Sequence, residues 1–155
     1  MTDDLALNRQ VCFALYSASR ATTGAYRTML DALGLTYPQY LVLLVLWEQD
    51  GRGVREICDA LDLDTGTLSP LLKRLEALEL IERQRLASDE RRVQIHLTDA
   101  GSALKAQASD IPARLATATG LSRTELAQLR DVLGRVSDAL HSATEDSSTN
   151  RKEPR

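Results

Sequence analysis

Apolar residues recur along the first part of this 155-residue chain at the spacing of a helix. Between Leu5 and Leu33 they fall three or four positions apart, or at multiples close to that period, which predicts one long amphipathic helix. Its apolar arc is wider than one neighbouring element would cover. We therefore expect this helix to be buried between two layers, as in a helical dimer interface. Gly34 is the expected C-terminal stop.

A second helix is predicted from Thr36 to about Gln49. Thr36 and Gln39 have the spacing of a capping box, in which a hydroxyl and an amide side chain satisfy backbone N–H groups reciprocally. Pro38 falls in the first turn, where its missing N–H is harmless. The segment 41–47 is apolar nearly all round, so we expect this helix at the centre of the fold.

The middle of the chain changes from helical spacing to a period of two. The expected order is a helix over Val54–Leu61, a turn over Asp62–Asp64, a second helix over Thr65–Leu78, strands over Leu80–Leu86 and Val93–Leu97, and a charged loop around Asp89–Arg92. This order predicts a winged helix-turn-helix, which places its second helix in the major groove of DNA.

Pro70 leaves the start of the second of these helices open. If the helix begins near Thr65, Pro70 lies past the first turn and costs a backbone hydrogen bond. If Thr67 is the cap, Pro70 is at the third position and costs little.

Two further helices are expected in the C-terminal third. Thr98 caps one that runs to about Ala118 with a kink at Pro112, and a capping box at Ser122 and Glu125 opens the last. The fold class is therefore mainly α (α+β). We expect one domain over 1–143, with a winged helix-turn-helix at 36–98, dimerisation helices at 5–33 and 99–143, and a disordered tail at 144–155.

The overall charge narrows the function without deciding it. A net charge of -3 counts against a protein that coats nucleic acid by bulk charge, but four arginines lie within 83–92. The two cysteines are too few for a disulfide framework and too scattered for a zinc site, so we expect neither a metal nor a cofactor. The acidic N-terminus has no signal-peptide layout, and the apolar runs are too short for a bilayer. A cytoplasmic location away from membranes is expected.

The predicted DNA contacts lie on the second helix of the helix-turn-helix and on the wing. Small hydroxyl residues at the helix N-terminus can approach phosphates, which the helix dipole favours there. Two basic residues one turn later can reach phosphates or guanine, and an arginine at the hairpin tip, oriented by Asp89, could enter the minor groove. The predicted DNA-binding residues are Thr65, Thr67, Ser69, Pro70, Lys73, Arg74, Asp89, Arg91 and Arg92.

Cys12 is the residue with the most chemistry in the first helix. Tyr16 is one turn on and lies on the same face. Tyr26 returns to nearly that face but about 21 Å along the axis, so it could meet Cys12 only across an antiparallel two-fold pair of these helices. Tyr37 could reach the same place. Phenol O–H groups donating to sulfur would favour thiolate over thiol; the alternative is a buried cysteine packed as a small hydrophobe.

Several contiguous stretches resemble one family. The wing residues Asp89–Arg91 followed by Leu97–Thr98 resemble the signature of the multiple-antibiotic-resistance regulator (MarR) family, and the resemblance extends over roughly 5–143. Within that family, the organic-hydroperoxide repressor branch (OhrR) is resembled by Cys12–Tyr16, Leu35–Leu41 and Leu63–Leu75.

The resemblance implies a peroxide-sensing Cys12 held by Tyr16, Tyr26 and Tyr37, some of them from the partner subunit. Some members use a second cysteine in the C-terminal helices, but this chain has none after Cys58, which we interpret as a core residue. The one-cysteine route is then expected, in which the oxidised sulfur forms a mixed disulfide with a low-molecular-weight thiol.

These expectations describe a homodimeric transcriptional repressor and not an enzyme. It would bind a pseudo-palindromic operator in double-stranded DNA while Cys12 is reduced, and release it when an organic hydroperoxide oxidises Cys12. One alternative is a MarR-type repressor released by a non-covalent small phenolic ligand. A less favoured one is a thiol peroxidase, which would need an arginine beside Cys12, such as Arg9 or Arg20, and would leave the helix-turn-helix unexplained.

Overall fold

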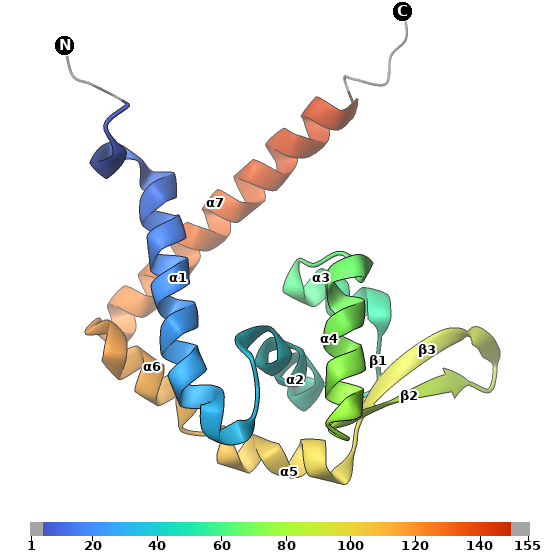
Figure 1. The fold of residues 1–155 in the computed structure, drawn as a ribbon. Helices are drawn as coiled ribbons and strands as arrows, with labels where there is room; N and C mark the ends of the chain where they lie inside the picture. Colours follow the sequence, from blue (N-terminus) through green and yellow to red (C-terminus); the bar gives the residue numbers. More distant parts are fainter. Residues whose placement is uncertain (1–4, 150–155) are drawn as a thin grey trace, which may run out of the picture. The chain divides into compact units, whose positions relative to one another are not determined.

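The computed structural model describes residues 5–149, without the side chains of residues 90, 91 and 146–149 (Figure 1). The elements are η1 (Leu7–Arg9), α1 (Val11–Leu30), η2 (Asp31–Leu33), α2 (Tyr37–Glu48), β1 (Arg52–Gly53), α3 (Val54–Leu61), α4 (Thr65–Ala77), β2 (Ile81–Leu86), β3 (Asp89–Leu97), α5 (Asp99–Gln107), α6 (Ile111–Thr119) and α7 (Arg123–Thr149). Helices dominate and one small antiparallel sheet accompanies them, which confirms the predicted mainly α class with a winged helix-turn-helix.

The chain divides into two compact units, Met1–Ile111 and Pro112–Arg155. The boundary lies inside the segment 99–143 that the sequence pattern assigned to dimerisation. The first unit holds the hydrophobic core, and α2 runs through its centre, as predicted. Tyr40, Val42 and Leu43 of α2 are at most 1% exposed, and α2 packs against α1, α3, α4 and α5.

Side-chain caps begin the helices where the sequence predicts them. The Gln39 N–H donates to the Thr36 hydroxyl, and the Gln39 side chain accepts from the Thr36 N–H at 2.9 Å. Thr98 caps α5, and Ser122 with Glu125 forms the capping box before α7. These devices are local, since the partners are three residues apart, and this is why the pattern finds them.

The N-terminal helix is shorter and more exposed than predicted. It begins at Val11 and not at Leu5, because Gln10 has an extended backbone and Leu7–Arg9 form a separate 3-10 turn. The Gln10 side chain closes that turn by donating to the Ala6 carbonyl. Leu30 is the one residue of α1 that is buried, and Val11 is 71% exposed. Burial between two layers is therefore not achieved within one chain.

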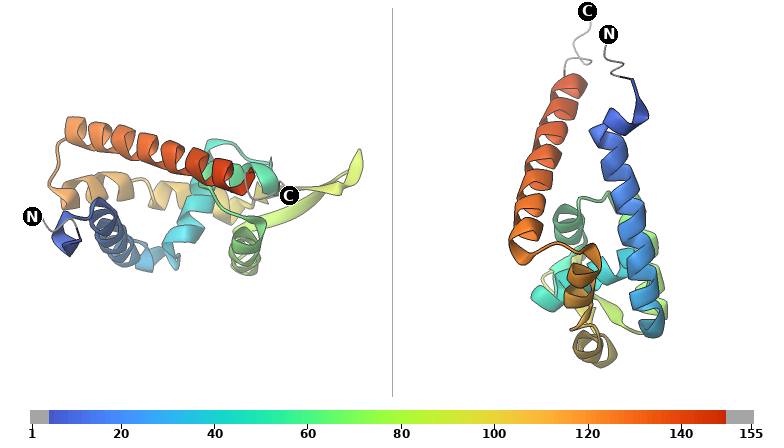
Figure 2. Two further views of the ribbon diagram at one scale, coloured as in Figure 1. Left: turned by 90° about the horizontal axis from the view of Figure 1, so that it is seen from above. Right: turned by 90° about the vertical axis from the view of Figure 1, so that its left-hand side faces the viewer.

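The hairpin is longer than predicted and pairs with a third strand. The turn lies at Ala87 and Ser88, so the segment 89–92 belongs to β3 and the expected loop there is wrong. The two-residue strand β1 pairs antiparallel with β3, giving the order β1-β3-β2. Two residues are too few to show a period of two. The β2–β3 hairpin projects from the helices of this unit (Figures 1 and 2).

The helix-turn-helix has the predicted bounds within one residue. Asp64 caps α4, so the helix begins at Thr65 and Pro70 lies inside it. Because proline has no N–H, the Gly66 carbonyl lacks its usual donor four residues on. The Asp64 cap therefore shows that the helix begins at Thr65 and not after a cap at Thr67.

The C-terminal helices differ from the expected pair in two places. The chain breaks between α5 and α6 before Pro112, which lies in the first turn of α6 and so costs no hydrogen bond; the predicted kink is thus an interruption. In the second unit α7 continues through residues 144–149, which were expected in the tail. Those residues are polar all round, so helical periodicity could not reveal them. Residues 150–155 lie outside the described part.

Within residues 5–149, no single helix has the length and apolar content to span a membrane. The pair Val11–Leu33 and Tyr37–Glu48, bent by 71°, meets both criteria only when taken together.

Candidate functional site

The exposed face of α4 carries the predicted DNA contacts of this helix. Four leucines, Leu68, Leu71, Leu72 and Leu75, hold the opposite face in the core. The side chains left outside are those predicted: Thr65, Thr67, Ser69, Pro70, Lys73 and Arg74 are all exposed. The helix therefore has the amphipathic form of a recognition helix, with small residues near its start and two cations in its third turn.

The N-terminus of α4 is occupied by its own cap. One carboxylate oxygen of Asp64 accepts from the Thr67 N–H at 2.7 Å, and the other accepts from the Thr67 hydroxyl at 3.0 Å. These hydrogen bonds, the backbone one first, lower the pKa of Asp64, so the carboxylate is charged at neutral pH. A phosphate would meet this charge at Thr67. Thr65 and Ser69 lie on the same exposed surface without this hydrogen bond to Asp64, so they are better placed for a phosphate than Thr67.

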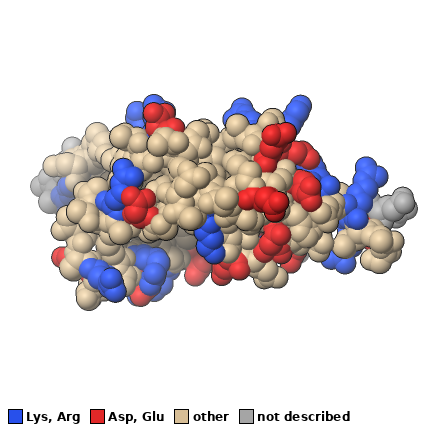
Figure 3. Space-filling model, turned by 90° about the horizontal axis from the view of Figure 1, so that it is seen from below, with Lys and Arg blue, Asp and Glu red and all other residues tan. Residues whose placement is uncertain are grey.

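The wing supplies cations on both strands. Arg83 and Arg85 of β2 and Arg92 of β3 are exposed, as is Asp89. In Figure 3 basic side chains lie beside the hairpin end, apart from a band of acidic ones. The Arg91 side chain lies outside the described residues, so its orientation by Asp89 stays a prediction.

An ion pair that the sequence pattern does not predict joins the wing to the recognition helix. The Arg83 guanidinium donates to the Glu76 carboxylate at 3.1 Å. The pair joins β2 to the last turn of α4. It crosses from a helix to a strand, so neither helical nor strand spacing reveals it.

Cys12 lies in the first turn of α1 as a free and exposed thiol. Tyr16, one turn on, is 59% exposed, and the Arg20 guanidinium lies over its ring at 5.6 Å from the centroid. Cys12, Tyr16 and Arg20 therefore follow one face of the helix. Cys58, by contrast, is buried in α3 and belongs to the core cluster, as expected.

Tyr26 and Tyr37 form a stacked pair at the far end of α1. Their ring centroids are 4.2 Å apart and their planes 20° apart. Burial and the neighbouring phenols of Tyr37 and Tyr40 raise the pKa of Tyr26 to about 12, and burial raises the pKa of Tyr37. Both hydroxyls are therefore protonated donors at neutral pH. Cys12 and Tyr26 lie on one continuous helix about 21 Å apart, so the chain does not bring them together on its own.

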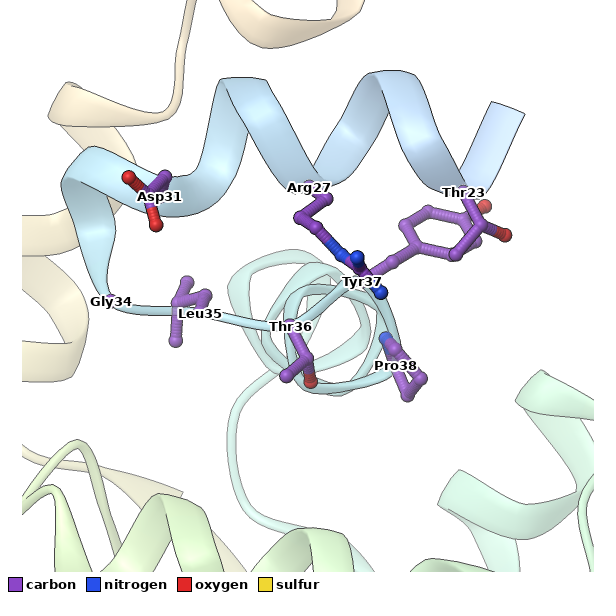
Figure 4. Close-up of a pocket in the computed structure, with 8 residues that line it drawn as sticks. All are labelled: Thr23, Arg27, Asp31, Gly34, Leu35, Thr36, Tyr37 and Pro38. Carbon is purple, nitrogen blue, oxygen red and sulfur yellow. The ribbon is translucent and has the colours of Figure 1, made fainter. Parts of the chain in front are cut away.

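A pocket of about 490 Å³ lies where α1 ends and α2 begins (Figure 4). Its lining residues are Thr23, Arg27, Asp31, Gly34, Leu35, Thr36, Tyr37 and Pro38. Figure 4 shows the Arg27 side chain pointing from α1 toward Tyr37 and Pro38 of α2. Sequence reasoning missed this pocket, although the i, i+4 spacing of Arg27 and Asp31 places both on one helix face. The described residues contain no cluster of His, Cys, Asp or Glu that could hold a metal ion.

A recognition helix, a basic wing and a compact helical core define a winged-helix DNA-binding protein. The family model of the transcriptional regulators SarA/Rot matches residues 25–108. The chain belongs to the MarR-type winged-helix family of transcriptional regulators.

Three relatives support this assignment. The chain is 49% identical over 139 residues to the transcriptional regulator TtmR of Methylorubrum extorquens, covering 90% of this chain and 71% of that protein. It is 45% identical over 139 residues to the organic hydroperoxide resistance transcriptional regulator of Bacillus subtilis, covering 90% and 95%. Reduced AbfR of Staphylococcus epidermidis bound to DNA superposes with a TM-score of 0.75 at 34% identity, covering 90% and 96%.

The family fixes the class of activity. Its members are transcriptional regulators and not enzymes, which removes the thiol peroxidase alternative. The protein is therefore a DNA-binding regulator of transcription.

Proposed function

We propose that the protein is a homodimeric repressor whose affinity for a pseudo-palindromic operator depends on the oxidation state of Cys12. The observation that carries the proposal is the placement of two groups on α1. An exposed thiol stands at one end, and a phenol held by stacking on Tyr37 stands at the other. The Cys12 end has a thiol without the stacked phenol, and the Tyr26 end has that phenol without a thiol.

A two-fold dimer would bring the two ends together. Positions 12 and 26 are symmetric about residue 19, so antiparallel packing of two α1 helices places Tyr26 of the partner subunit beside Cys12. Exposed apolar side chains favour such packing. At the N-terminal end of the first unit they are Leu5, Leu7, Val11, Phe13 and Tyr16, and in α7 they are Leu129, Val132, Leu133, Val136 and Leu140.

The chemistry at the sulfur then follows in two steps. Protonated phenols donate hydrogen bonds to the Cys12 thiolate, which attacks one oxygen of an organic hydroperoxide. An S–O bond forms, the O–O bond breaks, and the alcohol leaves with a proton, so that sulfur is oxidised by two electrons. The sulfenic acid next condenses with a low-molecular-weight thiol, giving a mixed disulfide and water.

The adduct would act through packing. A polar group attached to Cys12 cannot remain where the phenols lie, so the tyrosines move and the two reading heads lose their spacing on DNA. AbfR, at 34% identity, is solved bound to DNA in a reduced form and also in an overoxidised form. The reduced complex supports a reduced, DNA-binding state of the present protein.

The test compares Cys12→Ser with Cys58→Ser, which removes the buried cysteine as a matched control. DNA binding is followed by fluorescence anisotropy on a labelled duplex selected from a random library by the reduced wild-type protein. Cumene hydroperoxide with a small thiol should release wild type and Cys58→Ser and leave Cys12→Ser bound. Release of Cys12→Ser as in wild type overturns the sensor assignment.

The pocket beside Tyr37 favours a second candidate function. Its volume of about 490 Å³ would hold a small aromatic molecule, with Arg27 available to a phenolate or carboxylate and Thr23 to a hydroxyl. Such a ligand would release DNA under reducing conditions and from Cys12→Ser, and Arg27→Gln would weaken the response. If neither happens with a panel of small phenols, the pocket has no such effector role in DNA release.

A further inference from the structure

Four aromatic rings form a continuous row through the first unit. Tyr37 stacks on Tyr26, Tyr26 lies 5.7 Å from Tyr40 between centroids, and Tyr40 meets Trp47 edge-on at 6.2 Å. Tyr40 is only 1% exposed, so the middle of the row is enclosed by the core. The row begins at the proposed phenol donors and ends at the last turn of α2, the central helix in Figure 1.

Trp47, at the end of the row, both donates a hydrogen bond to α5 and accepts one from it. Its indole N–H donates to the Gly101 carbonyl at 2.9 Å, and its own carbonyl accepts from the Lys105 ammonium at 3.1 Å. The second bond also places a cation at the C-terminus of α2, where the helix dipole favours it. Trp47 is thus held on both its side chain and its backbone.

Gly101 in turn packs directly on the junction between α4 and β2. A Cβ added to Gly101 would lie 2.0 Å from the Leu80 carbonyl oxygen, so no other residue fits without backbone movement. The same Leu80 oxygen accepts from the Thr98 N–H at 3.1 Å, and the Thr98 hydroxyl donates to the Glu79 carbonyl. At this point α2, α5, the end of the recognition helix and the base of the wing meet.

From these contacts we infer that Trp47 is a positioning residue that couples the tyrosine pair to the DNA-reading element through Tyr40 and Gly101. The inference rests on the proposed function, because it takes movement of Tyr26 and Tyr37 as its input. A shift of those rings displaces Tyr40, whose ring lies 5.7 Å from that of Tyr26 and is enclosed by the core. The edge contact passes the shift to Trp47, and the indole hydrogen bond passes it to Gly101 and so to Leu80.

The main variant is Trp47→Phe, which keeps an aromatic ring against Tyr40 but removes the N–H donor. Lys105→Met removes only the exposed hydrogen bond from the Lys105 ammonium to the Trp47 carbonyl. It tests the same junction if Trp47→Phe fails to fold. Glu48→Gln is the matched control, since Glu48 is the next residue of α2 and pairs instead with Arg52. Thermal unfolding and the number of oxidisable thiols are measured for each.

The coupling is measured as the ratio of DNA dissociation constants after and before oxidation by cumene hydroperoxide and a small thiol. Trp47→Phe should lower this ratio roughly two- to thirtyfold relative to wild type, and Lys105→Met should lower it in the same sense. Glu48→Gln should leave it unchanged, and Cys12 should be oxidised to the same extent in all. A ratio in Trp47→Phe within about twofold of wild type overturns the coupling.

A second readout separates this inference from the proposed function. Trp47 is the only tryptophan of the chain, so its emission reports on this junction alone. Oxidation should shift the emission of wild type and not that of Cys12→Ser; an unshifted wild-type emission overturns the role of Trp47. If oxidation fails to release wild type from DNA at all, the proposed function itself falls. Release without an emission shift rejects only the coupling.

Discussion

At the scale of single residues, the proposed thiolate-stabilising residue Tyr26 is fixed by packing, whereas the proposed reactive residue Cys12 is not. Tyr26 is held by two other phenols and by burial, and those same neighbours keep it protonated. Cys12 is exposed, and no comparable contact holds it among residues 5–149. A reactive group that waits for a second subunit to complete its surroundings has this appearance in a single chain.

The raised pKa of Tyr26 gives a prediction for stability at high pH. An ordinary tyrosine ionises near pH 10, whereas folding raises the pKa of Tyr26 to about 12. Below pH 10 both states are protonated and the contribution is fully present. Between 10 and 12 only the unfolded state ionises, so stability falls as pH rises. Because the phenol is partly solvated, the slope should stay below about 1.4 kcal/mol per pH unit.

The measurement is chemical denaturation of wild type and Tyr26→Phe between pH 8 and about 11.5. Tyr26→Phe should lose less stability over the upper half of this range. Parallel pH profiles for the two proteins would show that the burial of Tyr26 does not govern its ionisation.

At the scale of elements, local signals were readable and distant ones were not. The capping box at Thr36 and the turn before Thr65 follow from residues within four positions of each other. Strand β1 has two residues, and the junction at Gly101 depends on Leu80 and Trp47, which lie 21 and 54 positions away along the chain. In a single sequence, spacing reveals helix faces and caps. It does not reveal which carbonyl a folded helix will touch.

The same limit applies to the candidate site. Cys12 and the tyrosines were found from helical geometry and a family resemblance. The stacking of Tyr26 on Tyr37 required the folded chain. The Asp64 cap on Thr67 is local, but Pro70 left the start of that helix open between Thr65 and Thr67. The sequence pattern did not predict the pocket beside Arg27, because its walls come from the end of one helix and the start of the next.

Pro70 gives a prediction at the element scale. It lies in the interior of α4 and is exposed, so replacing it with alanine restores an N–H for the Gly66 carbonyl without disturbing the core. Pro70→Ala should raise the free energy of unfolding by about 1–2 kcal/mol, less than the roughly 3 kcal/mol cost of an interior proline, because alanine also loosens the unfolded chain. Urea denaturation measures the gain, and an equal or lower stability would mean that α4 is already bent to accommodate the ring.

At the scale of the whole molecule, the decisive property is assembly. Leu129, Leu133, Val136 and Leu140 of α7 recur three or four residues apart, Val132 lies beside Leu133, and all five are 37–59% exposed, as expected for a helix face that binds a partner. Each unit of the chain leaves apolar surface uncovered by its own residues. A two-fold pairing covers such surfaces and presents two recognition helices together, which is the arrangement that a pseudo-palindrome requires.

Leu133→Glu in α7 tests that arrangement, with Arg135→Glu as the control. Leu133 lies within the apolar stripe, whereas Arg135 projects from another side of the helix and its substitution changes the net charge by more. Leu133→Glu should sediment as a monomer at micromolar concentration and bind the selected duplex at least about 100-fold more weakly, because the second recognition helix is no longer supplied at high effective concentration. Arg135→Glu should remain dimeric. Sedimentation equilibrium measures the assembly and anisotropy the affinity. A dimeric, fully binding Leu133→Glu would place the interface elsewhere, and the proposed meeting of Cys12 with the partner's tyrosines would then depend on α1 alone.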